Sequence, residues 1–397
     1  MKTQLNTIPE LLAELKQGRM VVLVDDEDRE NEGDLVLPAD FANPTSINFM
    51  ATQARGLICL SLTSQQIDRL KLPQMVREDM NYSPNKTAFT VSIEAASGVS
   101  TGISASDRAR TIQVAANPLS QPLDITSPGH IFPIRAQVGG VLKRAGHTEG
   151  SIDLCSLAGL NPAAVICEVM NEDGTMARLP ELRTFAQKHN LKIGSIVDLI
   201  KYRLQNEKLV EEIDKVDLSE SFGKDWQLRV FRSRIDGLEH LVFQKGEIQP
   251  NQPILTRVHV EDSLKDVFCF LKTGDNHLYQ AFNYLNKVDD GVVILLRRFQ
   301  KHHMAAEARA LQTLSDEQWA MGKFMDEKDF GVGAQILNQL GIRQIRLLSN
   351  RADRRAGLKA FDLEIVETVP FDILDTTEGE PIEKNEIESG PSYSTIQ

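Results

Sequence analysis

Long apolar runs, paired cysteines and an excess of positive charge are all missing from this 397-residue sequence. No stretch of about 18 consecutive apolar residues occurs, so the sequence predicts no membrane span. The polar N-terminal residues also lack the apolar run of a secretory signal. The four cysteines include no CxxC pair and lie in apolar surroundings; they are Cys59, Cys155, Cys167 and Cys269. They are predicted to be reduced core residues of a cytoplasmic protein, which excludes a disulfide framework.

The formal net charge is −12, from 44 Lys and Arg residues against 56 Asp and Glu residues. Nucleic acids and anionic membranes bind basic surfaces, so we expect neither kind of partner. The apolar fraction of 41% and the charged fraction of 25% are typical of a globular chain. At about 100–200 residues per domain, the length predicts two domains.

Strand and helix patterns follow one another without regular alternation in the first half of the chain. Thr7 precedes a helical pattern, residues 20–24 and 89–93 are β-branched or aromatic runs, and residues 127–133 are expected to form a tight turn. This mixture predicts an α+β layered domain with a mixed sheet over residues 1–205.

The second half of the chain begins with a charged segment. We expect residues 206–224 to be a linker and residues 225–372 to form a second domain of α/β type. The final segment, 373–397, is rich in Glu, Ser, Thr and Pro, and it is predicted to be disordered.

An acidic loop between two apolar strands is the most unusual local feature. Seven of the ten residues 25–34 are acidic. A solvated loop is the ordinary interpretation of such a run. Strands at both ends, however, bring the carboxylates together, and a hard divalent cation such as Mg²⁺ removes their repulsion. A calcium EF-hand does not fit, because Ala39 occupies the position of the required bidentate glutamate.

A glycine-rich segment, 139–146, precedes a predicted helix start at Thr148. Free N–H groups at a helix N-terminus, together with Arg144 and the Thr148 hydroxyl, would form a phosphate site. The alternative is an ordinary capped helix with an arginine that faces solvent. His147 is either a surface histidine or the partner of a carboxylate in a metal site.

Two further residues stand out by their surroundings. His130 lies between two prolines, and Glu168 lies inside an otherwise apolar strand at 163–169. A buried glutamate needs a partner or a function. The alternative for Glu168 is a strand-end side chain that faces water, since polar residues follow at 171–174.

Together these segments resemble 3,4-dihydroxy-2-butanone-4-phosphate synthase of riboflavin biosynthesis. The resemblance covers about residues 8–205 and lies in segments 25–34, 101–108, 127–130, 144–149 and 167–178. That family is a lyase that converts D-ribulose 5-phosphate to formate and L-3,4-dihydroxy-2-butanone 4-phosphate. The resemblance implies a homodimer with its active site near the subunit interface, and Mg²⁺ or Mn²⁺ as the cofactor.

The resemblance also implies a role for each residue singled out above. Glu30 and His147 would hold the metal. The catalytic residues would be His130, Glu168, Glu32 and Cys59. The substrate would be contacted by Arg29, Glu30, Asp34, Arg144, Ala145, Gly146, His147, Thr148 and Glu168. A divalent cation stabilises the enediolate of a ketose, carboxylates and a histidine serve the proton transfers, and the polar loop at 79–86 would close over the site.

Residues 225–372 resemble GTP cyclohydrolase II more weakly. The three zinc cysteines of that family have no counterparts: Asp262 stands where the first is expected, and Cys269 stands alone. Lys328 also replaces an arginine of the family pattern. These departures imply an inactive domain without zinc. The alternatives are a bifunctional enzyme that is also a GTP cyclohydrolase II, and a second domain that serves as a non-catalytic binding or assembly module.

Overall fold

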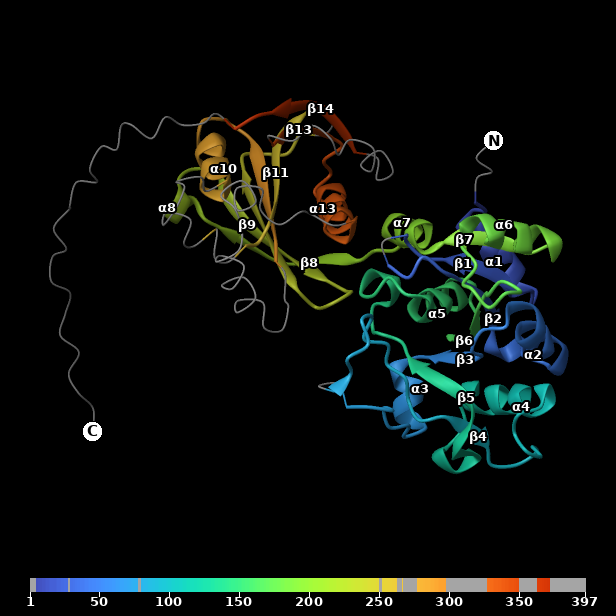
Figure 1. The fold of residues 1–397 in the computed structure, drawn as a ribbon. Helices are drawn as coiled ribbons and strands as arrows, with labels where there is room; N and C mark the ends of the chain where they lie inside the picture. The colour runs from blue at the N-terminus through green and yellow to red at the C-terminus, as the bar shows by residue number, and fades with distance from the viewer. Residues whose placement is uncertain are drawn as a thin grey trace, which may run out of the picture.

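The computed structural model of the chain consists of two units, each built around one β-sheet (Figure 1). It describes residues 5–27, 29–77, 80–249, 252–262, 266, 277–297, 327–349 and 363–371. The tail at 373–397, Cys269 and most of the segment with the expected zinc ligands lie outside the described residues. Among the described helices, none has the length and apolar character needed to cross a bilayer.

Seven strands form the first sheet, in the order β4-β5-β3-β6-β2-β1-β7. Strand β1 pairs antiparallel with β2 and parallel with β7, and β6 lies antiparallel between β2 and β3. The sheet is therefore mixed, as the sequence predicts. Its strands are β1 (Val21–Val24), β2 (Gly33–Pro38), β3 (Cys59–Leu62), β4 (Ile93–Ala95), β5 (Ile125–Arg135), β6 (Ala163–Glu168) and β7 (Lys192–Ser195).

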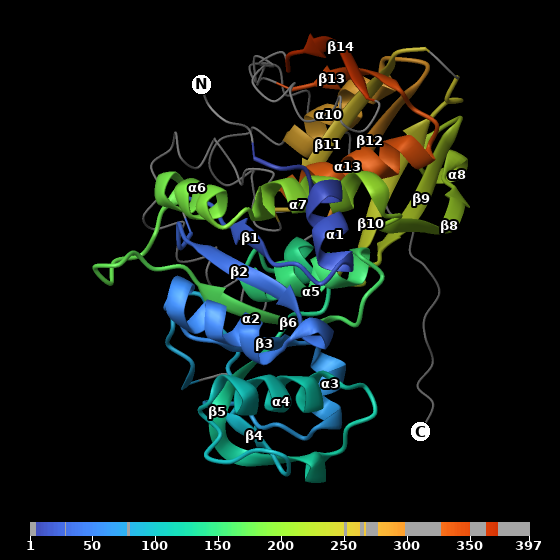
Figure 2. The ribbon, with the colours of Figure 1, turned by 90° about the vertical axis from the view of Figure 1, so that its right-hand side faces the viewer.

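Helices cover both faces of this sheet (Figure 2). Val21 and Leu23 share a buried core with α1, α5 and α7, whereas Val22 and Val24 share another with α2, α4 and α6. Side chains alternate between the two faces along a strand, and both faces are buried here. Strand β1 therefore appears in the sequence as an unbroken apolar run. The helices are α1 (Ile8–Lys16), α2 (Pro44–Phe49), α3 (Ser64–Arg69), α4 (Ala105–Ala116), α5 (His147–Leu157), α6 (Leu179–Lys188) and α7 (Ile196–Asn206), with short turns η1 (Ala39–Phe41), η2 (Met50–Ala54), η4 (Pro122–Asp124) and η5 (Gly140–Leu142).

The second sheet also has seven strands, in the order β14-β13-β11-β12-β10-β9-β8. Val293 packs toward α10 on one face, and Val292 and Ile294 pack toward α13 on the other. The strands are β8 (Val210–Asp217), β9 (Trp226–Ser233), β10 (Glu239–Lys245), β11 (Ile254–Val260), β12 (Gly291–Leu296), β13 (Gln344–Leu348) and β14 (Glu364–Val369); the helices are α8 (Ser219–Phe222), α10 (His277–Asn286) and α13 (Glu327–Gln339).

Three local predictions differ from the structure. Residues 127–133 belong to the long strand β5 instead of a tight turn, because β5 pairs with β3 at one end and with β4 at the other. Pro133 lacks an N–H, but its carbonyl still accepts a hydrogen bond from the Thr90 N–H at 2.9 Å. The strand expected at 89–93 is reduced to isolated bridges followed by β4.

The third difference concerns residues 206–224, which are not a simple linker. They contain α8 and strand β8, which pairs along its length with β9 at the edge of the second sheet. Most side chains of β8 are exposed, so its composition resembles that of a linker. The prediction of buried, free cysteines is confirmed for Cys59, Cys155 and Cys167.

Candidate active site

Three strand ends and one helix start meet on one face of the first sheet. The acidic loop connects β1 to β2, and Glu168 is the last residue of β6. Asp34 and Glu168 are directly paired across β2 and β6, so their side chains project from the same face. Helix α5, which begins at His147, packs on that face. Carboxylates from the acidic loop and from β6 therefore lie on the face of the sheet where α5 begins.

Asp25 holds the acidic loop in shape. Its Oδ1 accepts a hydrogen bond from the Glu32 N–H at 2.8 Å, and its Oδ2 accepts from the Glu30 N–H at 3.2 Å. Arg29 Nη1 donates to Asp25 Oδ2 at 2.7 Å and to Glu30 Oε2 at 2.5 Å. These bonds turn Glu30 toward His147. No such role for Asp25 is evident from the sequence.

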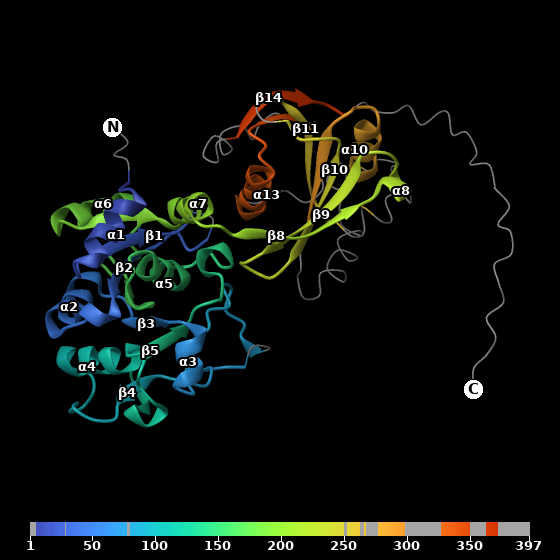
Figure 3. The same cartoon turned by 180° about the vertical axis from the view of Figure 1, so that it is seen from behind.

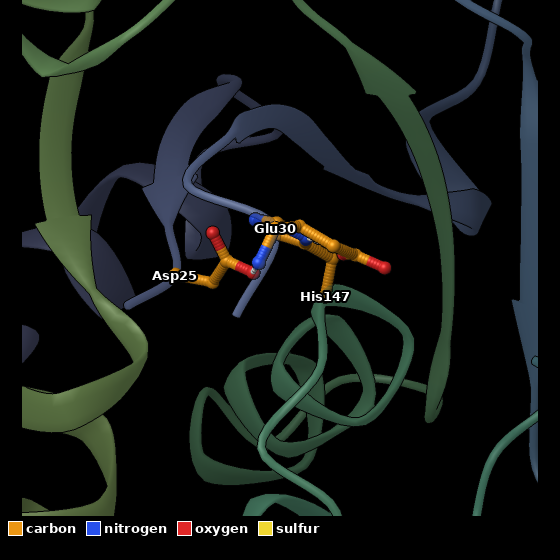
Figure 4. A group of neighbouring side chains, drawn as sticks. All are labelled: Asp25, Glu30 and His147. Atoms are coloured by element: carbon orange, nitrogen blue, oxygen red, sulfur yellow. Dashed lines mark hydrogen bonds and ion pairs between the residues drawn. The ribbon is translucent and has the colours of Figure 1, made fainter. Parts of the chain in front are cut away.

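The acidic loop and α5 together form a group of possible metal ligands. Atoms of Asp25, Glu30 and His147 all lie within 4.8 Å of one another (Figure 4). His147 Nδ1 lies 3.7 Å from Glu30 Oε2 and 3.7 Å from Asp34 Oδ1, which is too far for hydrogen bonds.

Two atoms of this cluster are buried without a hydrogen-bond partner: Asp34 Oδ1 and His147 Nε2. Buried polar atoms are normally paired, so these two atoms are suited to bind a ligand. Carboxylate oxygens with one imidazole suit a divalent cation such as Mg²⁺ or Mn²⁺. The residues present therefore fit the metal that the sequence predicts.

The charges in the cluster are strongly coupled. Burial raises the pKa of Asp34 to about 7, although the nearby His147 opposes this shift. Burial alone would lower the pKa of His147, but Asp34 and Glu30 raise that pKa to about 9. His147 holds the pKa of Glu30 at about 2. The imidazolium thus supplies the positive charge that the carboxylates require, and a bound cation would replace its proton.

A group of N–H and guanidinium donors adjoins these carboxylates at the start of α5. Gly146 is the N-cap residue, and no side chain caps this helix. A Cβ on Gly146 would lie 2.5 Å from Arg144 Nη1, 3.0 Å from Arg29 Nη2 and 3.0 Å from Glu149 Oε2, so two guanidinium groups and one carboxylate approach the same glycine. Thr148 is buried in the first turn, and Ala145 is exposed. Free N–H groups and two cations suit a phosphate.

The polar loop contacts both halves of the site through Asn85. Its Nδ2 donates to Glu30 Oε1 at 2.6 Å, and its carbonyl accepts from Arg144 Nη2 at 3.2 Å. Arg144 also donates to Thr87 Oγ1 at 3.2 Å. The loop therefore lies against the site. The loop is evident from its polar sequence, but the role of Asn85 is not.

Glu168 is fixed at the end of β6. Its Oε2 accepts a hydrogen bond from the Leu57 N–H at 2.9 Å. A Cβ on Gly56 would lie 2.2 Å from the Glu168 carbonyl oxygen, so only glycine fits beside it. Cys59 is buried on the same face. Burial and the charge of Glu168 raise the pKa of the Cys59 thiol, which therefore stays protonated.

Comparison with known proteins identifies the chain. The family model of 3,4-dihydroxy-2-butanone 4-phosphate synthase matches residues 9–202, and that of GTP cyclohydrolase II matches residues 211–370. A 3,4-dihydroxy-2-butanone 4-phosphate synthase of Photobacterium phosphoreum is 45% identical over 367 residues, which cover 92% of this chain and 99% of that protein. The chain belongs to the 3,4-dihydroxy-2-butanone 4-phosphate synthase family. The lyase reaction in riboflavin biosynthesis that the sequence predicts is thereby confirmed.

Two other proteins are similar to this chain over most of its length. The riboflavin biosynthesis protein RibBA of Synechocystis sp. is 48% identical over 381 residues, or 92% of this chain and 67% of that protein. The crystal structure of RibBX, a two-domain 3,4-dihydroxy-2-butanone 4-phosphate synthase from A. baumannii, is 40% identical with a TM-score of 0.74. That similarity covers 92% of this synthase and 100% of the RibBX chain. The two-unit fold predicted from the sequence is confirmed.

His130 is the one predicted catalytic residue of this synthase that lies apart from the described cluster. Its Nδ1 lies 2.8 Å from Glu94 Oε2, on the neighbouring strand β4. Strand β3 separates β5 from β6, so at about 4.8 Å per strand the backbone of His130 is about 10 Å from that of Glu168. Within the described part of one chain, His130 has no hydrogen bond or ion pair with Glu30 or His147.

Proposed function

We propose that this synthase binds D-ribulose 5-phosphate between a divalent cation on Glu30 and His147 and the N-terminus of α5. The observation that carries this proposal is the pair of buried, unpartnered atoms, Asp34 Oδ1 and His147 Nε2, beside Glu30. Mg²⁺ or Mn²⁺, when bound there, would act as a Lewis acid toward the substrate oxygens. Asp25 would keep its hydrogen bonds within the loop and position Glu30.

The phosphate of the substrate would lie at Gly146, where Arg29 and Arg144 approach the free N–H groups of α5. The backbone of Ala145 and the side chain of Thr148 would complete the groups that contact the phosphate. Asn85 joins the phosphate side to Glu30, so the polar loop would exclude water when substrate is present.

Proton transfers would fall to the carboxylates that face the bound sugar. Glu168 is fixed by the Leu57 N–H and lies across from Asp34, which suits a base held at one position. Glu32, on the acidic loop, would assist Glu168 in the proton transfers. The protonated Cys59 thiol would line the site without attacking the substrate.

We further propose a homodimer in which each subunit supplies His130 to the site of its partner. The support is the position of His130, about 10 Å from Glu168 by strand spacing and with a side chain that is 44% exposed. Two large apolar side chains, Leu119 (78% exposed) and Leu123 (90% exposed), precede β5 in the chain. Exposed apolar side chains of this size are typical of an interface.

The second unit would have no GTP cyclohydrolase activity and hold no zinc. This part of the proposal depends on the missing cysteines and on Lys328, and not on the absence of an ion. The boundary between the two units would lie between α7, the last element of the synthase unit, and β8, the first element of the second unit. The cytoplasmic location also stays a prediction.

Formate release from D-ribulose 5-phosphate tests the proposal. The full chain, stripped of metal with EDTA, should be inactive and should recover with Mg²⁺ or Mn²⁺. Full turnover in EDTA would contradict the metal site, although the family assignment would stand.

A further inference from the structure

The turn that carries Arg144 into the active site lies at the junction of the two units. It runs from residue 137 to 146 and has only one short element of its own, η5. Gly139 and Gly140 have φ values of +100° and +63°, which favour glycine. Because glycine has no side chain, neither residue can anchor the turn by side-chain contacts. Helices α7 and α13 face each other beside it (Figure 3).

We infer that the second unit is a positioning support for the synthase active site. Through Ile235, which packs with Leu142 of the turn in one buried cluster, and through Gln335, it holds the turn in the conformation that places Arg144 and the start of α5. This inference rests on the proposed phosphate site. It gives the second unit a role that requires neither GTP nor zinc.

The first unit holds the turn by polar contacts. Glu149 Oε1 accepts from the Gln137 N–H at 3.0 Å, and Glu149 Oε2 accepts from Arg144 at 2.6 Å. Asp153 Oδ2 accepts from the Val141 N–H at 2.7 Å. These bonds fix the two ends and the middle of the turn, but they leave its outer surface uncovered.

The second unit covers that surface with apolar side chains. Leu142 belongs to the buried cluster formed by Phe231, Ile235 and Val332 of the second unit, and it is only 3% exposed. Ile235 lies over Gly139: a Cβ there would be 3.1 Å from both Ile235 Cγ2 and the Ile235 carbonyl oxygen. Without the second unit, both Leu142 and Gly139 would face water.

A second connection runs through helix α7. Gln335 of α13 donates to the carbonyls of Leu204 at 2.6 Å and Glu207 at 2.7 Å, and it accepts from the Leu209 N–H at 2.8 Å. These carbonyls at the end of α7 would otherwise lack partners. The second unit therefore fixes the last turn of α7.

Arg203 in that last turn reaches back to the active-site turn. Its Nη1 donates to the Gly139 carbonyl at 2.9 Å and to Asp153 at 2.7 Å. Its remaining nitrogens pair with Glu207, whose carbonyl is one of the two that Gln335 binds. The apolar contacts and this polar chain thus converge on the same glycine.

Point variants of the full chain test the inference. Leu142→Ala and Ile235→Ala remove the apolar contacts, and Leu142→Met and Ile235→Val are the conservative partners. Leu285→Ala is the matched control, because Leu285 is fully buried in the second unit but belongs to the cluster beneath α10. The readouts are amide hydrogen exchange of residues 137–146 and the kinetic constants for formate release.

We expect exchange in the turn to be about tenfold faster in both alanine variants. The KM for D-ribulose 5-phosphate should rise by about tenfold, with a much smaller change in kcat, because Arg144 is displaced and the reacting groups are not. The conservative variants should restore both values. Leu285→Ala should leave the exchange of the turn and the KM at wild-type values.

Unchanged exchange and KM in Leu142→Ala and Ile235→Ala would overturn the inference. Equal effects from Leu285→Ala would also overturn it, because they would indicate general destabilisation. If Leu142→Ala does not fold, Ile235→Ala and Ile235→Val decide the result. If the wild-type chain releases no formate, the proposed function fails, whereas the exchange data still test the support of the turn.

Discussion

Replacement of Arg144 by alanine tests the proposed phosphate site. Its guanidinium approaches Gly146 at the open N-terminus of α5. A charge-assisted hydrogen bond to an anion contributes about 1.5–3 kcal/mol. The loss of that contact should raise the KM by about 10- to 150-fold, with a smaller effect on kcat.

Arg144→Ala also removes contacts within the protein. Arg144 donates to the Asn85 carbonyl and to Thr87, so the polar loop loses an anchor. Glu149 would keep its bond from the Gln137 N–H but lose its ion pair with Arg144, and its side chain is buried. We therefore expect a lower Tm in addition to the higher KM.

Two controls separate these effects. Arg144→Lys retains the positive charge but cannot form the bidentate hydrogen bonds of a guanidinium group. Its KM should therefore lie between those of the wild type and Arg144→Ala. Arg135→Ala removes an arginine whose partner, Asp68, is exposed, so both KM and Tm should change little. Kinetics of formate release and thermal unfolding give the values. A KM for Arg144→Ala within twofold of the wild type would refute the phosphate assignment.

Three other predictions concern the base, the dimer and the second unit. Glu168→Gln can still accept from the Leu57 N–H, so it should fold and lose about 10²–10⁴-fold in kcat; wild-type turnover would make Glu168 structural. His130→Ala and Glu168→Gln subunits, each inactive alone, should regain activity when mixed, to about a quarter of the wild-type level for random pairing of equal amounts; no recovery in mixtures shown to exchange subunits would contradict a shared site. Metal analysis should find no stoichiometric zinc, and incubation with GTP should yield no formate; one zinc per chain together with GTP turnover would restore the bifunctional interpretation.

Local signals in the sequence predicted much of the first unit. Thr7, which precedes a helical pattern in the sequence, is the N-cap residue of α1, and its backbone N–H donates to Glu10 Oε2 at 2.8 Å. The acidic loop was also predicted, since strands on both sides force its carboxylates together. Such signals involve neighbours in the chain, and residue type alone is enough to identify them.

Contacts between distant segments were not predictable in the same way. Asn85 contacts Glu30 across 55 positions, and nothing in its own segment distinguishes it from the other polar residues there. Asp25 looked like any other acid of the loop, but hydrogen bonds fold it inward. Strand β8 was mistaken for a linker because an edge strand with exposed charged side chains has the composition of one.

The most direct test of the account is a titration of the metal-free full chain with Mn²⁺, followed by electron paramagnetic resonance. The account predicts that the wild type binds the ion and that Glu30→Gln and His147→Ala each bind it at least about tenfold more weakly. Asp262→Asn, in the second unit, is the control and should bind Mn²⁺ as the wild type does. Wild-type affinity in both Glu30→Gln and His147→Ala would contradict the central claim that these two residues hold the catalytic cation.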